Sequence, residues 1–323
     1  MKPSITPYTG ASPMKPWPTL ADKAFCLNFS SGQTLFYYDT APANDDPPNG
    51  GTTPVLVLIH GLGDEADSWR HLIPLLSTAG FRVLALDLPG FGRSVAPGRI
   101  SLKNHTASVL RLLEAAKIKP ETPVFLVGNS LGALVAETAA FKKPGLVKGL
   151  ILLDGSIPGG PARIGLLALA KLLFSRKWYR AYRANPEGAW LSLYAYYADL
   201  DSMTEADKVF LRERVIARVN SSSQERAFFA TQRSLVWAFA TGFHGYAQKI
   251  RSFKGKILLL WGEKDRIMPL SSAEPFKSLR KDIELRIVSG AGHLPQQEKP
   301  AETAKFIAEF VNSDKTRGTN EQA

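Results

Sequence analysis

A serine flanked by glycines is the residue whose type and spacing most clearly suggest chemistry. Ser130 is the centre of a Gly-Asn-Ser-Leu-Gly segment at residues 128–132, between an apolar run at 124–127 and a helix-like segment at 131–141. A sharp strand-to-helix turn strains the backbone of such a serine and raises its hydroxyl above the sheet edge, and small glycines relieve the crowding. The pattern predicts a nucleophilic serine. The alternative is a tight turn with a buried capping serine.

A serine hydroxyl needs a base that accepts its proton. The histidines of the chain are His60, His71, His105, His244 and His293. His293 follows the predicted strand 284–288 through a Ser-Gly-Ala-Gly loop, which places it at the carboxyl edge of a sheet, where ligands bind in such folds. We therefore predict His293 as the base. His60 directly precedes Gly61 and is interpreted as the organiser of its loop.

A carboxylate must hold the imidazole in the correct tautomer and stabilise its charged form. Asp265 follows the predicted strand 257–260 and is our candidate, and Asp154, after the predicted strand 150–153, is the rival. Asp87 also ends a strand, but Pro-Gly-Phe-Gly follows at 89–92, so we interpret it as a turn-capping residue. Glu263 is close in sequence to Asp265 and is a further alternative.

Acyl chemistry also needs hydrogen-bond donors where a carbonyl oxygen becomes negative. The backbone N–H of Leu131, directly after the serine, is one candidate. The second is expected in the His-Gly-Leu-Gly loop at 60–63, because glycines let the backbone approach a substrate closely. Leu62 N–H is our choice, with Gly63 next.

The elements that must position these residues alternate between strand and helix. Apolar runs at 55–59, 82–86, 124–127, 150–153, 257–260 and 284–288 predict buried strands, with helical spacing at 69–78, 105–116, 131–141, 271–280 and 301–312 between and after them. Residues 24–28 and 34–39 predict a hairpin. The alternation predicts an α/β fold with a mostly parallel sheet flanked by helices.

The rhythm is interrupted for about 100 residues between the fourth and fifth of these runs, which is too long for one crossover. We predict a flexible tail at 1–22, a core at 23–155 and 256–312, a helical insertion at 156–255 and a tail at 313–323.

Composition narrows the class of protein. The 323 residues are 45% hydrophobic and 21% charged, values that exclude disorder, collagen-like order and a disulfide scaffold for the chain as a whole. Cys26 is the only cysteine, which excludes an intramolecular disulfide. No uncharged apolar run reaches the roughly 18 residues that span a bilayer. The first residues lack the apolar core of a secretory signal, so we expect a cytoplasmic protein.

The net charge of +11 is concentrated in the insertion, where residues 161–255 carry 15 Lys and Arg against 7 Asp and Glu. Such a surface can bind nucleic acid, an anionic membrane or an acidic ligand. The charges are spread along helix-like sequence and no nucleic-acid-binding motif is present, so we interpret them as solvated helix faces and expect no nucleic-acid partner.

Ser130, Asp265 and His293, in this order, resemble the catalytic residues of the α/β-hydrolase fold superfamily. The resemblance spans about residues 24–312. It rests on His-Gly-Leu-Gly at 60–63, Asp-Leu-Pro-Gly-Phe-Gly-Arg-Ser at 87–94, Gly-Asn-Ser-Leu-Gly at 128–132, Gly-Glu-Lys-Asp at 262–265 and Gly-Ala-Gly-His at 290–293. It implies that the insertion is a cap, or lid, over the active site, and it implies no metal or organic cofactor.

Within the superfamily, a serine nucleophile sets aside haloalkane dehalogenases and epoxide hydrolases, which use aspartate. The Gly-Asn-Ser-x-Gly elbow resembles carbon–carbon bond hydrolases, which usually carry a tryptophan after the catalytic histidine, where this chain has Leu294. The expectation is a capped esterase or lipase acting on a small-to-medium apolar ester. The alternatives are a C–C hydrolase, amidase or cofactor-free haloperoxidase-like enzyme, and a ligand-binding or receptor protein without useful turnover.

The cap is expected to decide substrate choice. It is rich in aromatic residues, most of which would pack its own helices, while several would line an apolar substrate site. The candidates for substrate binding are Trp178, Trp190, Trp237 and Phe239.

Overall fold

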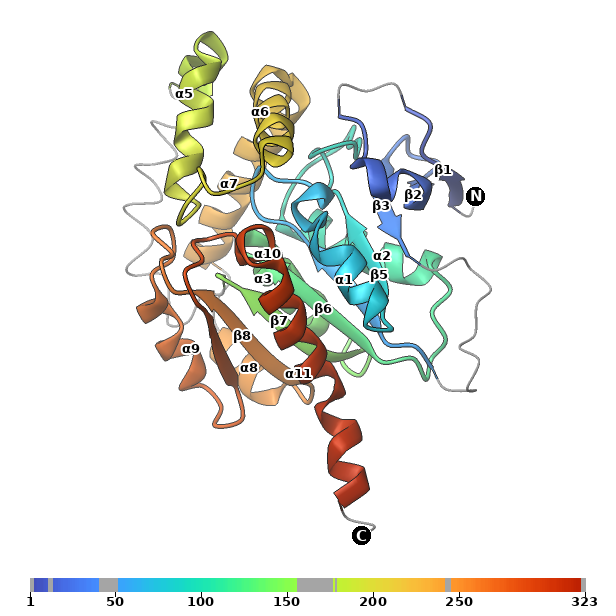
Figure 1. The fold of residues 1–323 in the computed structure, drawn as a ribbon. Helices are drawn as coiled ribbons and strands as arrows, with labels where there is room; N and C mark the ends of the chain where they lie inside the picture. The colour runs from blue at the N-terminus through green and yellow to red at the C-terminus, as the bar shows by residue number, and fades with distance from the viewer. Residues whose placement is uncertain are drawn as a thin grey trace.

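A computed structural model describes residues 3–10, 14–40, 52–155, 177, 179–241 and 245–320 (Figure 1). Their strands form a nine-stranded sheet in the order β1-β2-β3-β5-β4-β6-β7-β8-β9. The strands are β1 (Ser4–Pro7), β2 (Ala24–Asn28), β3 (Thr34–Asp39), β4 (Val55–Ile59), β5 (Arg82–Leu86), β6 (Val124–Asn129), β7 (Val147–Leu153), β8 (Lys256–Gly262) and β9 (Glu284–Val288).

The sheet is mostly parallel, as the sequence predicts. Strands β4 to β9 run parallel to one another, whereas β1, β2 and β3 pair antiparallel and β3 joins β5 antiparallel. All five residues of β4, Val-Leu-Val-Leu-Ile, are buried, because its alternate side chains enter the apolar cores on opposite faces of the sheet. The parallel direction brings the carboxyl ends of β4 to β9 to one edge.

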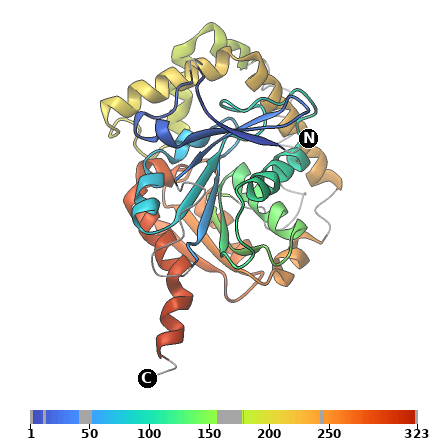
Figure 2. The same cartoon turned by 90° about the vertical axis from the view of Figure 1, so that its right-hand side faces the viewer.

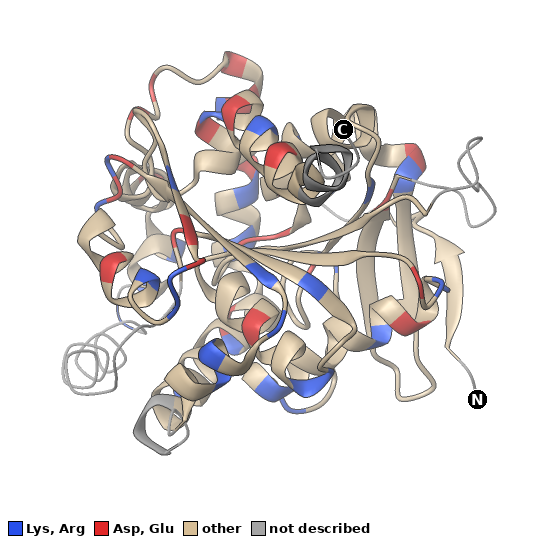
Figure 3. Cartoon of the chain, turned by 90° about the horizontal axis from the view of Figure 1, so that it is seen from below, with Lys and Arg blue, Asp and Glu red and all other residues tan. Residues whose placement is uncertain are grey.

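Helices cover both faces of this sheet (Figure 2). One face packs against α1 (Leu72–Thr78) and α11 (Pro300–Asn320). The other packs against α2 (Leu102–Ala115), α3 (Leu131–Lys142), α8 (Tyr246–Ser252) and α9 (Glu274–Lys277). Seen from below, the sheet crosses between the two helical layers, and charged residues of both signs are interspersed over the helices and loops (Figure 3).

The segment between β7 and β8, which we call the inserted segment (residues 156–255), contains no strand in its described residues. Besides α8, it contributes α5 (Pro186–Leu191), the 3-10 helix η3 (Ser192–Ala195), α6 (Glu205–Asn220) and α7 (Ser222–Thr241). Local signals start two of these helices, because the Asn185 side chain accepts from Gly188 N–H and Thr204 accepts from Asp207 N–H. Figure 1 shows α5 and α6 at the end of the molecule away from the C-terminus.

The prediction of a flexible tail at residues 1–22 is wrong for its described part. Ser4–Pro7 forms β1, paired with β2, because an exposed edge strand offers free backbone groups to any extended segment nearby. Pro18–Lys23 forms the 3-10 helix η1, and the Trp17 ring packs edge-on against Phe210 of α6 with centroids 4.9 Å apart.

Element ends also differ from expectation. Helix α11 extends to Asn320, well into the predicted tail at 313–323. The helix predicted at 271–280 is only a 3-10 turn, η4 (Leu270–Ser272), followed by the four-residue α9. Among the described helices, none combines the length and the apolar composition that crossing a bilayer requires.

Candidate active site

Ser130 lies in a strained turn between β6 and α3. Its φ of 53° and ψ of −114° are unusual for a residue with a side chain, and it occupies the N-cap position of α3 without a capping hydrogen bond from its hydroxyl. A Cβ on Gly132 would overlap the Ile59 carbonyl, and a Cβ on Gly128 would overlap the backbone of Gly132. The glycines therefore permit the close approach that the turn requires, and the capping interpretation of Ser130 finds no support.

His293 and Asp265 are hydrogen-bonded to each other at the same edge of the sheet. His293 Nδ1 lies 2.8 Å from Asp265 Oδ2, and both side chains are buried. The other carboxylate oxygen of Asp265 accepts from the backbone N–H groups of Ile267 at 2.7 Å and Met268 at 2.9 Å. With Nδ1 bonded to the carboxylate, Nε2 is the imidazole nitrogen left for a proton transfer.

Asn129 joins the serine turn to the histidine loop. Its side-chain amide donates to the His293 carbonyl at 3.1 Å and to the Leu153 carbonyl at 3.3 Å. The N–H of Ser130 donates to the same Leu153 carbonyl at 2.9 Å. The ends of β6 and β7 and the loop after β9, which are far apart in the sequence, thus meet around Ser130 and His293.

Glu298 fixes the other side of the histidine loop. It lies in α10 (Pro295–Glu298), and its carboxylate accepts from Gly292 N–H and from Ala198 N–H of the inserted segment, each at 2.7 Å. Burial raises the pKa of Glu298, and the backbone N–H groups around it oppose the rise. The inserted segment also contacts the loop directly, because His293 N–H donates to the Tyr196 carbonyl at 2.7 Å.

The loop after β4 lies beside Ser130. A Cβ built on Gly61 would lie 3.5 Å from the Ser130 Cβ. Within the described part of the chain, neither Leu62 N–H nor Leu131 N–H donates to another group. These are the two donors that the sequence predicts for an oxyanion.

His60 organises this loop, as its position predicts. Its Nε2 accepts from Leu88 N–H at 2.9 Å, so Nδ1 carries the proton and donates to the Gly61 carbonyl at 2.7 Å. Full burial lowers the pKa of His60, which keeps the ring neutral. Asp87 likewise fills its expected capping role, because its carboxylate accepts from Ala66 N–H and Arg93 N–H.

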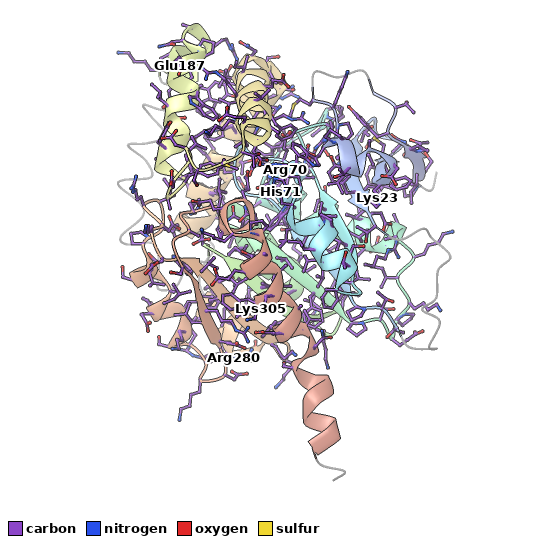
Figure 4. The ribbon with its side chains drawn as sticks, viewed as in Figure 1. Lys23, Arg70, His71, Glu187, Arg280 and Lys305 are labelled. Carbon is purple, nitrogen blue, oxygen red and sulfur yellow. The ribbon has the colours of Figure 1, made fainter. Side chains whose placement is uncertain are left out.

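The sequence did not reveal that charges of the inserted segment pair with acidic residues beside the predicted oxyanion loop. Arg218 of α6 lies 2.8 Å from Asp64, and Arg214 lies 3.3 Å from Glu65. Asp207, also of α6, pairs with Arg70 and His71, which lie between α1 and α6 (Figure 4). The interpretation of these α6 charges as a solvated face is therefore wrong. Charge patterning alone could not show it, since each partner is more than 130 residues away.

Two aromatic residues of the inserted segment lie against the site. The Tyr196 ring centroid is 5.9 Å from that of His293, and a Cβ built on Gly63 would lie 3.3 Å from the Phe228 ring. Neither was among the four substrate-binding candidates.

The four candidates themselves stay predictions. Trp190 packs in a cluster with Tyr197, Leu200, Leu211 and Leu294, and Trp237 is 70% exposed on α7. Trp178 and the side chain of Phe239 lie outside the described residues, as does His244.

Asp154, the rival acid, is buried next to the Asp265–His293 pair. Among the described residues, these three form the one group with the spacing of metal ligands, each offering an atom within 4.8 Å of the others. Two carboxylates and an imidazole suit a divalent cation, yet the 2.8 Å bond from Nδ1 to Asp265 is also that of an imidazole oriented by a carboxylate.

Comparison with known proteins agrees with this fold. The sequence profile described as the alpha/beta hydrolase family matches residues 56–306. The pimeloyl-[acyl-carrier protein] methyl ester esterase of Methylococcus capsulatus is 28% identical over 268 residues, covering 81% of this chain and 96% of that protein. The 2-hydroxy-6-oxononadienedioate/2-hydroxy-6-oxononatrienedioate hydrolase of Escherichia coli K12 is also 28% identical, covering 79% and 86%.

Solved structures show the same fold. A membrane phospholipase A, described as a bacterial virulence factor, superimposes with a TM-score of 0.69 at 25% identity over 90% of this chain and 86% of that one. A putative lipase from Acinetobacter baumannii superimposes with a TM-score of 0.72 at 22% identity, covering 91% and 93%.

Proposed function

Because the chain belongs to the alpha/beta hydrolase family and its characterised relatives are hydrolases, we propose that it is a serine hydrolase that cleaves a carboxylic ester. The observation that carries the proposal is the hydrogen bond between His293 and Asp265. The Asn129 side chain holds the His293 loop next to Ser130, which has a strained backbone and a hydroxyl that does not cap α3. The arrangement supports a nucleophile, a base and an orienting acid at one sheet edge.

The reaction follows from these positions. Ser130 Oγ attacks the ester carbonyl carbon while His293 Nε2 takes its proton, and Asp265 stabilises the imidazolium that forms. The backbone N–H groups of Leu62 and Leu131 hold the oxyanion, each contributing a factor of about 10²–10³ to turnover. His293 then protonates the departing alcohol. In the second half, it activates a water molecule that hydrolyses the acyl-enzyme.

The inserted segment acts in this proposal as a cap that selects an apolar substrate. Tyr196 and Phe228 present aromatic rings next to His293 and the loop after β4. The ion pairs of Arg218 and Arg214 with Asp64 and Glu65 hold the cap against the loop that carries Leu62. Aromatic side chains at these positions favour a small-to-medium apolar acyl or aryl group.

A covalent labelling experiment tests the nucleophile. The purified protein is treated with a fluorophosphonate and the adduct is located by peptide mass spectrometry, with Ser130→Ala as the matched negative and Ser94→Ala, a buried serine that donates to the Asp87 carbonyl, as the positive control. We expect modification of Ser130 alone, together with turnover of p-nitrophenyl esters that depends on acyl length. An unlabelled Ser130 in a folded protein would leave a ligand-binding protein as the better account.

A C–C bond hydrolase is the second candidate, favoured by the relatives named as hydrolases of 2-hydroxy-6-oxo-dienedioates. The elbow asparagine agrees with it, whereas Leu294 stands where those enzymes usually carry tryptophan. Side-by-side assays with a 2-hydroxy-6-oxo-dienedioate and the ester series separate the two. A higher kcat/KM for the dienedioate would replace the ester proposal, with Ser130 labelling unchanged.

A further inference from the structure

Asp154 is a buried carboxyl group that the proposed reaction does not use. It follows β7, is 0% exposed and has a φ of +45°, a conformation that costs energy for a residue other than glycine. Its Oδ1 accepts from Gly262 N–H at 2.7 Å. If Asp154 is ionised, its buried Oδ2 accepts no hydrogen bond from any described residue. An unsatisfied buried oxygen of this kind is costly and calls for a partner.

The nearest acidic neighbour is Asp265, which together with His293 places atoms within 4.8 Å of the Asp154 carboxyl. Two carboxylates this close in a buried site do not both ionise, so one of them holds a proton. Asp265 receives three N–H groups, from Ile267, Met268 and His293, whereas Asp154 receives one. The negative charge is therefore better stabilised on Asp265, and the proton belongs on Asp154.

Other charged groups around Asp154 act in the same direction. Burial first, and then the charge of Asp265, raise the pKa of Asp154 far above its ordinary value, and Glu298 adds to the rise while Gly262 N–H opposes it. The basic member of this group of three described side chains is His293, which faces Asp265 through Nδ1. A proton on Asp154 also gives its Oδ2 the hydrogen-bond partner that it otherwise lacks.

We propose that Asp154 is a neutral carboxylic acid that donates its O–H to the Asp265 carboxylate and thereby positions Asp265 against His293. This inference rests on the proposed serine-hydrolase function and adds a positioning residue to it. The proton remains with Asp154 throughout, because Asp265 stays ionised while His293 gains and loses its proton. Asp154 thus completes the set of hydrogen bonds that holds the Asp265 carboxylate in place, and it does not touch the substrate.

The backbone at Asp154 couples this carboxyl pair to the serine. Its own N–H donates to the Leu260 carbonyl at 3.0 Å, and the preceding Leu153 carbonyl accepts from Ser130 N–H. A Cβ on Gly155 would lie 2.6 Å from the Ser130 Cα, so the chain after Asp154 packs directly on the serine turn. The end of β7 therefore contacts the acid through a side chain and the nucleophile through the backbone.

The test compares Asp154→Asn with Asp154→Ala in the full-length protein. Asparagine reproduces a protonated aspartic acid, since its oxygen can accept from Gly262 and its amide can donate to Asp265. We expect Asp154→Asn to retain kcat within threefold of wild type. Asp154→Ala removes the donor and is expected to lower kcat about 10- to 100-fold with KM little changed. Loss of tenfold or more in Asp154→Asn, or less than tenfold in Asp154→Ala, would overturn the proposal.

A second readout does not depend on turnover. The ¹³C shift of the Asp154 carboxyl carbon, assigned by its absence from Asp154→Asn, should report a protonated group at pH 7, and Asp265→Asn should shift its titration to lower pH. An ionised Asp154 at pH 7 in the wild-type protein contradicts the inference. Absent Ser130 labelling with a protonated Asp154 would instead reject the serine-hydrolase function alone.

A metal-chelation control separates the remaining possibility. If the three groups bound a divalent ion, both carboxylates would be ionised, and EDTA would abolish activity in a way that added metal restores. We expect EDTA to leave kcat unchanged. Metal-dependent recovery would show that Asp154 is a ligand and not a proton donor.

Discussion

At the scale of single residues, the site depends on which carboxyl group meets the imidazole. Asp265 and Asp154 follow adjacent strands, and both are buried. Only Asp265 bonds to His293 Nδ1, while Asp154 turns to Gly262 N–H. The two carboxyl groups thus have different hydrogen-bond donors around them, which is the basis of our proposal that Asp154 is neutral beside an ionised Asp265.

This difference predicts a large effect of Asp265→Asn. If the amide N–H₂ faced His293 Nδ1, it would favour the wrong tautomer of the imidazole. If the amide oxygen faced Nδ1, it would accept the hydrogen bond but would lack the negative charge that stabilises the imidazolium. We expect kcat on esters to fall by about 10⁴-fold. The measurement is steady-state kinetics together with circular dichroism.

The matched control is Asp282→Asn, which removes an exposed carboxylate paired with Arg280 and should leave kcat unchanged. Near-normal turnover in Asp265→Asn would contradict the assignment of the acid.

At the scale of elements, close backbone packing fixes the turn that carries Ser130, the proposed nucleophile. Strand β6 and helix α3 meet at Gly128 and Gly132, and the end of β4 lies directly against Gly132. The dipole of α3 begins at Ser130, so its N-terminus favours negative charge near the hydroxyl. A side chain at either glycine would overlap backbone atoms and force α3 away from β6 or from the end of β4.

Gly132→Ala is therefore expected to destabilise the protein by about 3 kcal/mol and to reduce esterase activity strongly, because its Cβ would overlap the Ile59 carbonyl. Urea unfolding and kinetics measure the two effects. Gly98→Ala is the control, since a Cβ there would have no atom within 4 Å and its φ is not in the left-handed region. Equal stability of the two variants would show that the turn tolerates a side chain.

At the scale of the whole molecule, buried neutral histidines make the free energy of unfolding depend on pH. His105 is 0% exposed, its Nε2 lies 2.8 Å from Thr231 Oγ1 of α7, and burial lowers its pKa to about 3, with His60 adding to the effect. The unfolded chain holds this imidazole at an ordinary pKa of about 6.5. Between these values the unfolded state binds more protons, so stability falls as pH decreases from 7.

The expected loss from His105 alone between pH 7 and pH 5 is about 2 kcal/mol. His105→Gln keeps a polar atom for Thr231 without a titrating group, so its stability should fall by about 2 kcal/mol less over the same interval. Urea unfolding of both proteins at pH 8, 7 and 5 measures this, and the pH 8 difference gives the packing cost of the substitution. The same pH dependence in both proteins would place the titration elsewhere.

The sequence by itself determined the strands of the parallel sheet and the residues that follow them. Runs such as β4 and residues 257–261 of β8 are apolar because both faces of the sheet are covered, and glycines at 128 and 132 mark a turn that no side chain fits. These signals are local, so they could be recognised without knowing what lies opposite. The parallel order then brings Ser130, Asp265 and His293 to one edge.

Only the tertiary structure decided the partners of individual side chains. It pairs His293 with Asp265 and leaves Asp154 on Gly262, joins α6 to Asp64 and Glu65, and adds β1 at the sheet edge. Each of these contacts joins residues separated by 18 to more than 150 positions, and each depends on the direction of a side chain or a free strand edge. Spacing along the chain carries no information about either, because both are set by how the elements pack against one another.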